Sequence, residues 1–503
     1  MTLRELIRSA VAHAGLDVQL PRAEEFADTP VSSVAYDSRS VSPNAVFVAL
    51  KGLRADGAAY ATDAIGRGAI AVISEDLPPA GITVPWLRVP DARLALAALA
   101  AEFYGRPSEQ LTLVGITGTN GKTTTSYLLA AIFEAAGLKC GRIGTVGYRI
   151  GAKEYDAART TPEAPELQRL LRDMVAQGCG ACVMEVSSHA LVLRRADHLR
   201  FAAGIFTNLT RDHLDFHVSM EEYFAAKRRL FEMLPGEAPA VINADDPRGL
   251  AIAEASPVPV TYAVNQAADV TPGPLSLSFD GLEFDARTPR GIVHVRSRLM
   301  GRPNVYNILA AVGVTAALEV PLDAIERGLA RLQGVPGRFE RVSSRDDDIT
   351  VVVDYAHTDD ALRNLLEMAR PLAARRLLTV FGAGGDRDRT KRPLMGMVAA
   401  RLSDVVVITS DNPRSEDPAR IIDEVNLGAQ PEMRQRGTEV VTIVDRRDAI
   451  LHAVAGAEAG DVVLIAGKGH EKYQEVGGVT LPFDDVAVAR EALEARRLRS
   501  RVG

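Results

Sequence analysis

The amino-acid sequence predicts an α/β protein built from three domains. Its 503 residues amount to a little over three domains at about 150 residues each. Two breaks rich in proline and glycine, GRPSEQ at 105–110 and QGVPGR at 333–338, divide the chain. Short β-branched runs alternate with helical stretches, which is typical of α/β folds. We therefore expect domains at residues 1–107, 108–335 and 336–503.

The first domain is predicted to be a small α/β unit. It opens with a helix, because Leu3, Leu6, Ile7 and Ala10 lie on one helical face. Short strands are predicted from the runs VAYDS, AVFVAL, AIAVIS and WLRVP, which alanine-rich helical stretches separate.

The second domain begins with a strand, a glycine-rich turn and a helix, in the run LTLVGIT followed by GTNGKTTTSYLLAAIFEAAG. Gly118 and Gly121 let backbone N–H groups approach phosphate oxygens, and Lys122 adds a positive charge. Thr123 offers a hydroxyl to Mg²⁺ at the helix N-terminus. The strict Walker pattern has a glycine where this chain has Ile116. Because the strand and helix are both present, we predict ATP or GTP binding in a P-loop ATPase-like domain with a mainly parallel sheet.

The third domain contains five apolar β-branched runs, each followed by polar residues. They predict a parallel sheet covered on both faces, in a Rossmann-like doubly wound domain. Since ligands bind beyond the carboxyl ends of such strands, residues 354–357, 386–389, 411–414 and 468–471 should converge. The run FGAGGDRD fails the dinucleotide fingerprint, because its sixth position is Arg387. A nicotinamide oxidoreductase is therefore disfavoured.

Composition excludes several classes of protein. The chain has 58 Lys and Arg against 65 Asp and Glu, a formal charge of −7, which argues against a nucleic-acid binder. Its apolar runs are too short for a membrane span. Three cysteines make no disulfide framework, which fits the cytoplasm, and Cys179 and Cys182 suggest buried thiols rather than a redox pair.

Several motifs occur in a fixed order along the chain: GTNGKTTT, MEVSSHAL, FTNLTRDHLDFH, YFAAK, INADDP, GRPNVYNILAA, PGRFE, VDYAHT, GDRDRTKRPLM, DNPR and GKGHE. With them the chain resembles the Mur ligases, ATP-dependent amide-forming enzymes that build the peptidoglycan stem peptide. It also resembles their folylpolyglutamate synthetase relatives. The motif order is similar to that of the third ligase of the pathway, which adds meso-2,6-diaminopimelate to UDP-N-acetylmuramoyl-L-alanyl-D-glutamate.

The resemblance implies a reaction and a metal site. The γ-phosphate of ATP would pass to the substrate carboxylate, and the incoming amine would attack the acyl phosphate. Lys122, Glu185, His213 and Lys227 would be catalytic, with Mg²⁺ held by Thr123, Glu185, His213 and Lys227 as a carbamate. On its own, Lys227 would be interpreted as a solvated lysine. His213 and His217 have the spacing of a helical zinc pair, but the glutamate that such a motif needs is Leu214.

The resemblance also assigns residues to each substrate. The ATP residues are Gly118, Thr119, Asn120, Gly121, Lys122, Thr123, Thr124, Asn304, Asn307, Arg338 and Asp354. The alternatives are a helix cap for Asn304 and a strand-end turn residue for Asp354. The residues for the UDP-linked substrate are Tyr36, Ser38, Leu53, Arg54, Ala55, Thr160, Thr161, Ser187 and Arg195. Leu193 stands where the family commonly has glutamine.

The amino-acid substrate is assigned to residues of the third domain: Arg387, Asp411, Asn412, Pro413, Arg414, Gly467 and Glu471. An arginine matches the second carboxylate of diaminopimelate, which lysine lacks, and the alternative is a turn with a surface arginine. Other readings are a lysine-adding ligase, a folylpolyglutamate-synthetase-like ligase, or a nucleotide-dependent switch. We expect a cytoplasmic monomer whose partners are small molecules, with no nucleic acid and no membrane.

Overall fold

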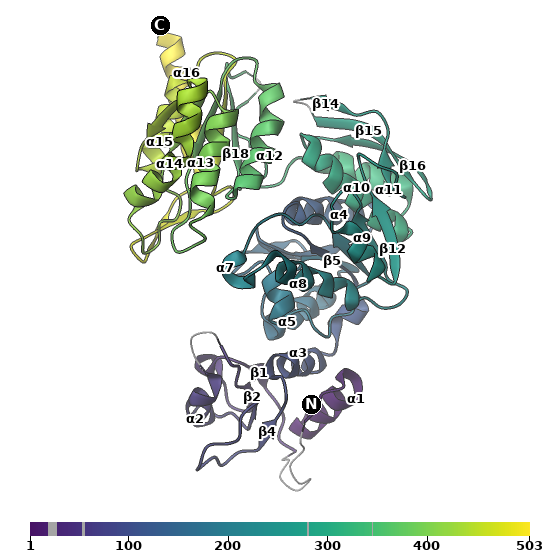
Figure 1. Cartoon of the computed structure of the whole chain (residues 1–503). Coiled ribbons are helices and arrows are strands. Elements are labelled where there is room, and N and C mark those ends of the chain that lie inside the picture. The colour runs from purple at the N-terminus through teal and green to yellow at the C-terminus, as the bar shows by residue number, and fades with distance from the viewer. Residues whose placement is uncertain (19–27, 53–55, 279–280, 345, 503) are drawn as a thin grey trace.

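The computed structural model describes residues 1–18, 28–52, 56–278, 281–344 and 346–502. Three bodies follow one another along the molecule, with the first part at one end and the C-terminal part at the other (Figure 1). The predicted α/β class and three-part architecture are confirmed, whereas the boundaries at 107/108 and 335/336 stay a prediction. Within the described residues, no helix combines the length and apolar character needed to cross a membrane.

The first part is a four-stranded parallel sheet, whose strands lie in chain order. Helix α1 begins with a capping box between Thr2 and Glu5. Helix α3 (Ala92–Phe103) contacts both α1 and helix α5 (Ala164–Ala176) of the central part, so it lies between the first and central parts. The elements are α1 Leu3–Ala14, β1 Ser33–Ala35, η2 Ser38–Ser40, β2 Ala45–Val48, η3 Gly57–Tyr60, α2 Ala61–Gly66, β3 Ala71–Ser74, β4 Trp86–Arg88 and α3 Ala92–Phe103.

The central part is an eight-stranded sheet in the order β12-β11-β10-β5-β9-β6-β7-β8. It is parallel from β12 to β6, as predicted, and antiparallel at β7 and β8. Its elements are η4 Pro107–Gln110, β5 Thr112–Thr117, α4 Lys122–Ala135, β6 Cys140–Ile143, β7 Tyr148–Ile150, β8 Lys153–Tyr155, α5 Ala164–Ala176, β9 Ala181–Glu185, α6 Ser188–Val192, β10 Ala203–Phe206, α7 Leu214–His217, α8 Met220–Glu232, β11 Pro239–Asn243, α9 Gly249–Glu254 and β12 Val258–Tyr262. Strand β5 therefore delivers the glycine-rich turn to the middle of the carboxyl edge.

A small antiparallel sheet, which was not predicted from the sequence, completes the central part. Its signal was the alternation of buried Leu282, Phe284 and Ala286 with less buried neighbours. The sheet shares one apolar core with helices α4, α10 and α11. The elements are β13 Thr271–Pro272, β14 Ser276–Ser278, β15 Gly281–Thr288, β16 Gly291–Ser297, α10 Arg302–Ala317 and α11 Leu322–Arg331.

The C-terminal part is a six-stranded sheet in the order β17-β18-β22-β19-β20-β21. The five strands predicted from the sequence are parallel, and β17 adds an antiparallel edge. Separate apolar cores lie on its two faces, one under α12, α13 and α14, the other under α15 and α16. The doubly wound prediction is confirmed. The elements are β17 Glu340–Arg341, β18 Thr350–Asp354, α12 Asp359–Ala369, η5 Arg370–Leu372, β19 Leu377–Phe381, α13 Lys391–Leu402, β20 Val405–Ile408, α14 Pro418–Arg436, β21 Glu439–Thr442, α15 Arg446–Gly456, β22 Val462–Ala466, β23 Tyr473–Val476, β24 Val479–Pro482 and α16 Asp485–Val502.

Candidate active site

The glycine-rich turn between β5 and α4 is shaped to receive phosphate. Gly118 has φ of 146°, and a Cβ there would lie 1.9 Å from Thr207 Oγ1, so only glycine fits. Lys122 folds back over the turn and donates to the carbonyls of Gly118 and Thr119, each at 2.8 Å. Because α4 begins at Lys122, its free N–H groups and its positive dipole end face the same space.

A neighbouring loop after β10 fixes the phosphate turn. Asn208 accepts from the backbone N–H of Asn120 at 2.9 Å, and its own carbonyl accepts from Thr119 N at 2.8 Å. Thr207 Oγ1 donates to the Asn120 carbonyl at 2.6 Å. The motif FTNLTRDH therefore has a positioning role that the sequence analysis did not assign.

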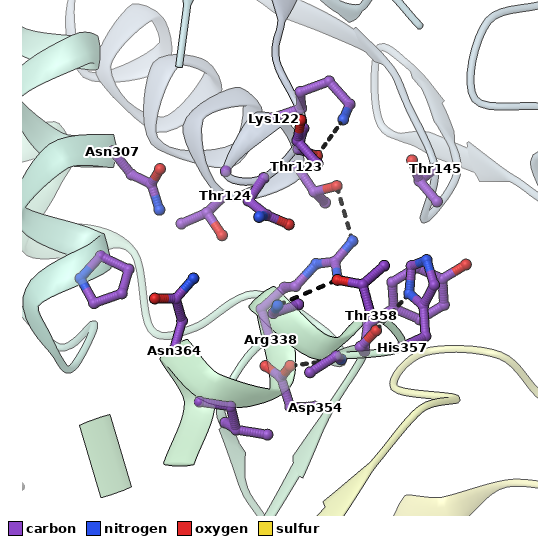
Figure 2. Close-up of a pocket in the computed structure, with 18 of the residues that line it drawn as sticks. Lys122, Thr123, Thr124, Thr145, Asn307, Arg338, Asp354, His357, Thr358 and Asn364 are labelled. Carbon is purple, nitrogen blue, oxygen red and sulfur yellow. Dashed lines mark hydrogen bonds between the residues drawn. The ribbon is translucent and has the colours of Figure 1, made fainter. Parts of the chain in front are cut away.

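A cavity of about 290 Å³ lies over the turn, between the central and C-terminal parts. Figure 2 shows its lining, with Lys122, Thr123 and Thr124 on one side and Arg338, Asp354 and Asn364 on the other. Arg338 Nη2 donates to Thr123 Oγ1 at 3.2 Å, so the contact joins the two parts. Asn304 and Asn307 also line this cavity, together with Thr119, Asn120 and Gly121.

Asn304 and Asp354 both make local hydrogen bonds, as expected if Asn304 is a helix cap and Asp354 a strand-end turn residue. Asn304 donates from its side chain to the Met300 carbonyl at 2.7 Å, near the start of α10. Asp354 accepts from the backbone N–H groups of Phe339 and Ala356, at 2.7 and 2.8 Å. Both side chains still line the cavity, so these bonds position them at its wall.

Oxygen ligands suited to a divalent cation gather beside the phosphate turn. Glu185 is 1% exposed, and its carboxylate accepts from the N–H and the hydroxyl of Thr145, both at 3.0 Å. It lines the cavity with the Thr123 hydroxyl and with His213. Hard oxygen donors of this kind fit Mg²⁺. Burial lowers the pKa of His213 to about 3, so its imidazole is neutral and keeps a lone pair.

Lys227 is not the solvated lysine that its local sequence suggests. It is 1% exposed, donates from Nζ to the Gly118 carbonyl at 2.7 Å, and lies 4.4 Å from the ring centre of Tyr223. Burial lowers its pKa well below the usual range, and the charge of Lys122 lowers it further. Lys227 therefore stands directly under the phosphate turn with its amine predisposed to the neutral form.

A second cavity opens at the carboxyl ends of the C-terminal strands, where the sequence analysis expected a site. It is lined by Arg387, Asp411, Asn412, Arg414, Gly467 and Glu471. Pro413 belongs to the same turn but does not line the cavity. Gly467 has φ of 119°, a conformation that residues with a side chain rarely adopt, and a Cβ there would also crowd the Asp411 carboxylate. The two cavities share Asp212, His213, Tyr355, His357 and Thr358, so they meet at this point.

Hydrogen bonds hold the polar side chains of the second cavity in place. Asn412 donates to Glu471 Oε2 at 3.0 Å and accepts from Lys468 Nζ at 2.8 Å. Burial raises the pKa of Glu471, and the nearby Asp411 raises it further. Arg414 donates to the Gly385 carbonyl at 2.8 Å and pairs with Glu475.

The residues expected for the UDP-linked substrate fall into two groups. Tyr36 lines a third cavity, with Tyr155, Arg159 and Glu163 of the central part. Ser38 is buried and lies apart from that cavity. Leu53, Arg54 and Ala55 lie outside the described residues.

The second group is a connected cluster on the central part. Arg195 pairs with Glu163 at 2.8 Å and donates to the Thr161 carbonyl at 3.2 Å. Thr161 Oγ1 accepts from the N–H of Ser187 at 3.1 Å, and Thr160 and Ser187 line the nucleotide cavity. Leu193 ends α6, where its N–H donates to His189 at 2.9 Å.

Four lining or supporting residues were not assigned to a substrate from the sequence, although His357 and Lys468 fall in the strand-end ranges that were expected to converge. Asp212 and His357 lie where the two cavities meet, Lys391 lines the second cavity, and buried Lys468 orients Asn412. Lys391 follows Arg387 closely in the motif GDRDRTK, and this closeness in sequence could have suggested that Lys391 lines the same cavity. Its amine donates to the His357 carbonyl at 3.0 Å, and burial lowers its pKa.

Family models match almost all of this architecture. "Mur ligase family, catalytic domain" matches residues 30–104, "Mur ligase middle domain" matches 116–315, and "Mur ligase, glutamate ligase domain" matches 337–469. The chain belongs to the Mur ligase family. Like the other members, this Mur ligase is an ATP-dependent amide-forming enzyme, and the nicotinamide and switch alternatives are excluded.

Individual relatives agree with that assignment over their full length. A UDP-N-acetylmuramoyl-L-alanyl-D-glutamate–2,6-diaminopimelate ligase of Solibacter usitatus is 49% identical over 485 residues, 95% of this chain and 97% of the relative. The ligase of the same name from Gloeobacter violaceus is 48% identical over 500 residues, 99% of both chains. A solved structure of a ligase with that name is 35% identical, with a TM-score of 0.69 and 99% of each chain covered.

Proposed function

We propose that this Mur ligase uses ATP to join meso-2,6-diaminopimelate to UDP-N-acetylmuramoyl-L-alanyl-D-glutamate, through an acyl phosphate. The observation that carries the proposal is the meeting of two cavities at Asp212, His213 and His357. One cavity contains the phosphate turn and the other contains two arginines at the strand ends. A phosphorylated carboxylate at this junction would lie within reach of an amine from the second cavity.

The chain's own groups account for phosphate binding and charge stabilisation. Lys122 and the N-terminus of α4 would hold the phosphates, in place of the carbonyl contacts that Lys122 now makes. Arg338 reaches Thr123 from the other side and would clamp the nucleotide when the parts close. Thr123, Glu185, His213 and carbamylated Lys227 would hold Mg²⁺, which neutralises developing phosphate charge when bound.

Carbamylation of Lys227 is supported by its environment. A lysine must lose its proton before the amine can attack CO₂, and burial favours the neutral amine here. The product is a carboxylate, a hard ligand next to the Gly118 carbonyl that Nζ now contacts.

The UDP-linked substrate would run from the first part to the junction. Its uridine end is proposed at Tyr36, and the path continues along Glu163, Arg195 and Thr161 to the nucleotide cavity. Arg195 would exchange Glu163 for a substrate carboxylate or phosphate oxygen.

Arg414 is proposed to select diaminopimelate over lysine. The Arg414 guanidinium is only partly exposed, and without the second carboxylate it loses a charge-assisted hydrogen bond that a lysine substrate cannot replace. Arg387 lines the same cavity and adds positive charge. We also propose that the enzyme works as a cytoplasmic monomer with small molecules as its only partners.

The test is a product analysis. The protein is incubated with ATP, Mg²⁺ and the UDP-linked dipeptide, together with diaminopimelate or lysine, and the product is weighed by mass spectrometry. We expect the diaminopimelate adduct and one ADP per amide bond. Preferential use of lysine by the protein with Arg414 intact would refute the specificity, and addition of glutamate to a folate would refute the substrate assignment.

A further inference from the structure

A two-stranded hairpin lies against the turn that carries Arg414. Strands β23 and β24 pair only with each other as a sheet, and Val476 forms an isolated parallel bridge to Arg414. Gln474 donates from its side chain to the Asp411 carbonyl at 2.7 Å. The backbone N–H of Glu475 donates to Asn412 Oδ1 at 3.0 Å. The hairpin is therefore joined to three of the four residues of the turn at 411–414.

The backbone of Arg414 itself depends on this hairpin. Arg414 has φ of 53°, a left-handed conformation that is unfavourable for a residue with a side chain. Its N–H donates to the Glu475 carbonyl at 2.9 Å, and its carbonyl accepts from Gly477 N at 2.7 Å. These two bonds hold the strained residue in place, so the hairpin determines the backbone position from which the Arg414 side chain extends.

Glu475 also holds the guanidinium of Arg414. Its Oε2 lies 2.9 Å from Arg414 Nε, and the Gly385 carbonyl accepts from Nη1 at 2.8 Å. Among the residues that the structure describes, no acceptor is hydrogen-bonded to Nη2. Two guanidinium nitrogens are thus fixed by the protein, and the third is available at a side chain that lines the second cavity.

This arrangement matters because an arginine recognises a carboxylate through a planar fork of fixed direction. A guanidinium without a partner on Nε rotates among several rotamers, and binding a carboxylate then costs side-chain entropy. A guanidinium already fixed on one edge loses less freedom when the ligand arrives.

We propose that Glu475 is a specificity-determining positioning residue, which orients Arg414 so that its available Nη2 meets the second carboxylate of the amino-acid substrate. This inference rests on the proposed use of diaminopimelate and adds a residue that touches the arginine rather than the substrate. The ion pair with Glu475 reduces the positive charge that Arg414 offers to the substrate. In exchange, it fixes the direction of the guanidinium.

The test compares two substitutions at this position in the full-length enzyme. In Glu475→Ala the Nε partner is lost, and we expect the KM for diaminopimelate to rise roughly tenfold to a hundredfold, with the KM for ATP changed less than about twofold. Any activity with lysine, which has no second carboxylate for Arg414 to bind, should change little, so discrimination between the two amino acids falls. In Glu475→Gln an amide oxygen still accepts from Nε, and most of the discrimination should return.

The matched control is Thr480→Ala, because Thr480 lies opposite Glu475 across the hairpin and is exposed. Thr480→Ala changes the hairpin but keeps the Glu475 carboxylate, so it should leave both KM values unchanged. An effect seen only in Glu475→Ala then comes from loss of the carboxylate. A Glu475→Ala enzyme with an unchanged or lower KM for diaminopimelate would overturn the proposal, as would a Glu475→Gln enzyme no better than Glu475→Ala. If the unaltered enzyme does not use diaminopimelate at all, the proposed function fails instead.

Discussion

The buried ion pair between Arg446 and Asp485 gives the most quantitative prediction about stability. Both side chains are 0% exposed, and the pair is bidentate, with Nε to Oδ1 at 2.8 Å and Nη2 to Oδ2 at 2.7 Å. Arg446 also donates to the carbonyls of Ala466 and Ser410, at 3.0 and 3.4 Å. It therefore ties helices α15 and α16 to the ends of β22 and β20, which carry the second cavity.

Replacing Asp485 by alanine leaves a buried charge without its counter-ion. Each charge-assisted hydrogen bond that is lost contributes about 1.5–3 kcal/mol. Breaking a buried pair by removing one partner costs about 3–5 kcal/mol. The carbonyls of Ala466 and Ser410 still accept from Arg446. We therefore expect the free energy of unfolding of the C-terminal part to fall by about 3–4 kcal/mol, in the lower part of that range. For a domain of this size that lowers Tm by roughly 6–16 °C.

Scanning calorimetry of the full chain measures this change. Trp86 is the only tryptophan and lies in the first part, so its fluorescence reports that part separately and should show an unchanged transition. The control is Glu491→Ala, because Glu491 pairs with Arg447 on the same two helices, with side chains 54% and 46% exposed. An exposed pair contributes about 0–1 kcal/mol. Equal effects of the two substitutions would refute the reasoning.

Three further predictions concern the site and the pH dependence of stability. Lys227→Ala should lower kcat about tenfold to a hundredfold, and added acetate or formate should restore part of the rate by replacing the carbamate. Burial lowers the pKa of His217 to about 4, so the folded state resists its protonation. The free energy of unfolding should therefore fall as the pH drops from about 6.5 to 4, and His217→Asn should flatten that slope in urea titrations. Arg211 donates to Thr390 Oγ1 at 2.6 Å across the two parts, so Arg211→Ala should lower kcat/KM roughly tenfold and enlarge the radius of gyration in X-ray scattering.

Each of these has a contrary outcome. Full activity of Lys227→Ala without any added carboxylate would exclude a role for its carbamate. An unaltered pH slope in His217→Asn would show that other groups cause the acid sensitivity. An Arg211→Ala enzyme with normal kcat/KM and normal scattering would show that the parts stay together without this contact.

Local patterns made much of the fold and site predictable. The phosphate turn was predictable because its glycines, Lys122 and Thr123 are neighbours in sequence. The strand ends of the third domain were predictable because parallel strands place their carboxyl ends at one edge, as the second cavity confirms. The small sheet of β13 to β16 was missed although β15 and β16 alternate buried and exposed residues, so a period-2 signal for it was present in the sequence.

The sequence by itself determined the family motifs, the α/β class and the residues that follow each strand, because these depend on short segments of chain. Only the tertiary structure decided that Lys227 is buried under the phosphate turn and that Glu475 holds Arg414. It also decided that Arg338 meets Thr123, 215 positions away. Burial and such contacts arise when distant segments pack together, and they set the pKa of a lysine or the direction of a guanidinium. No local pattern contains that information.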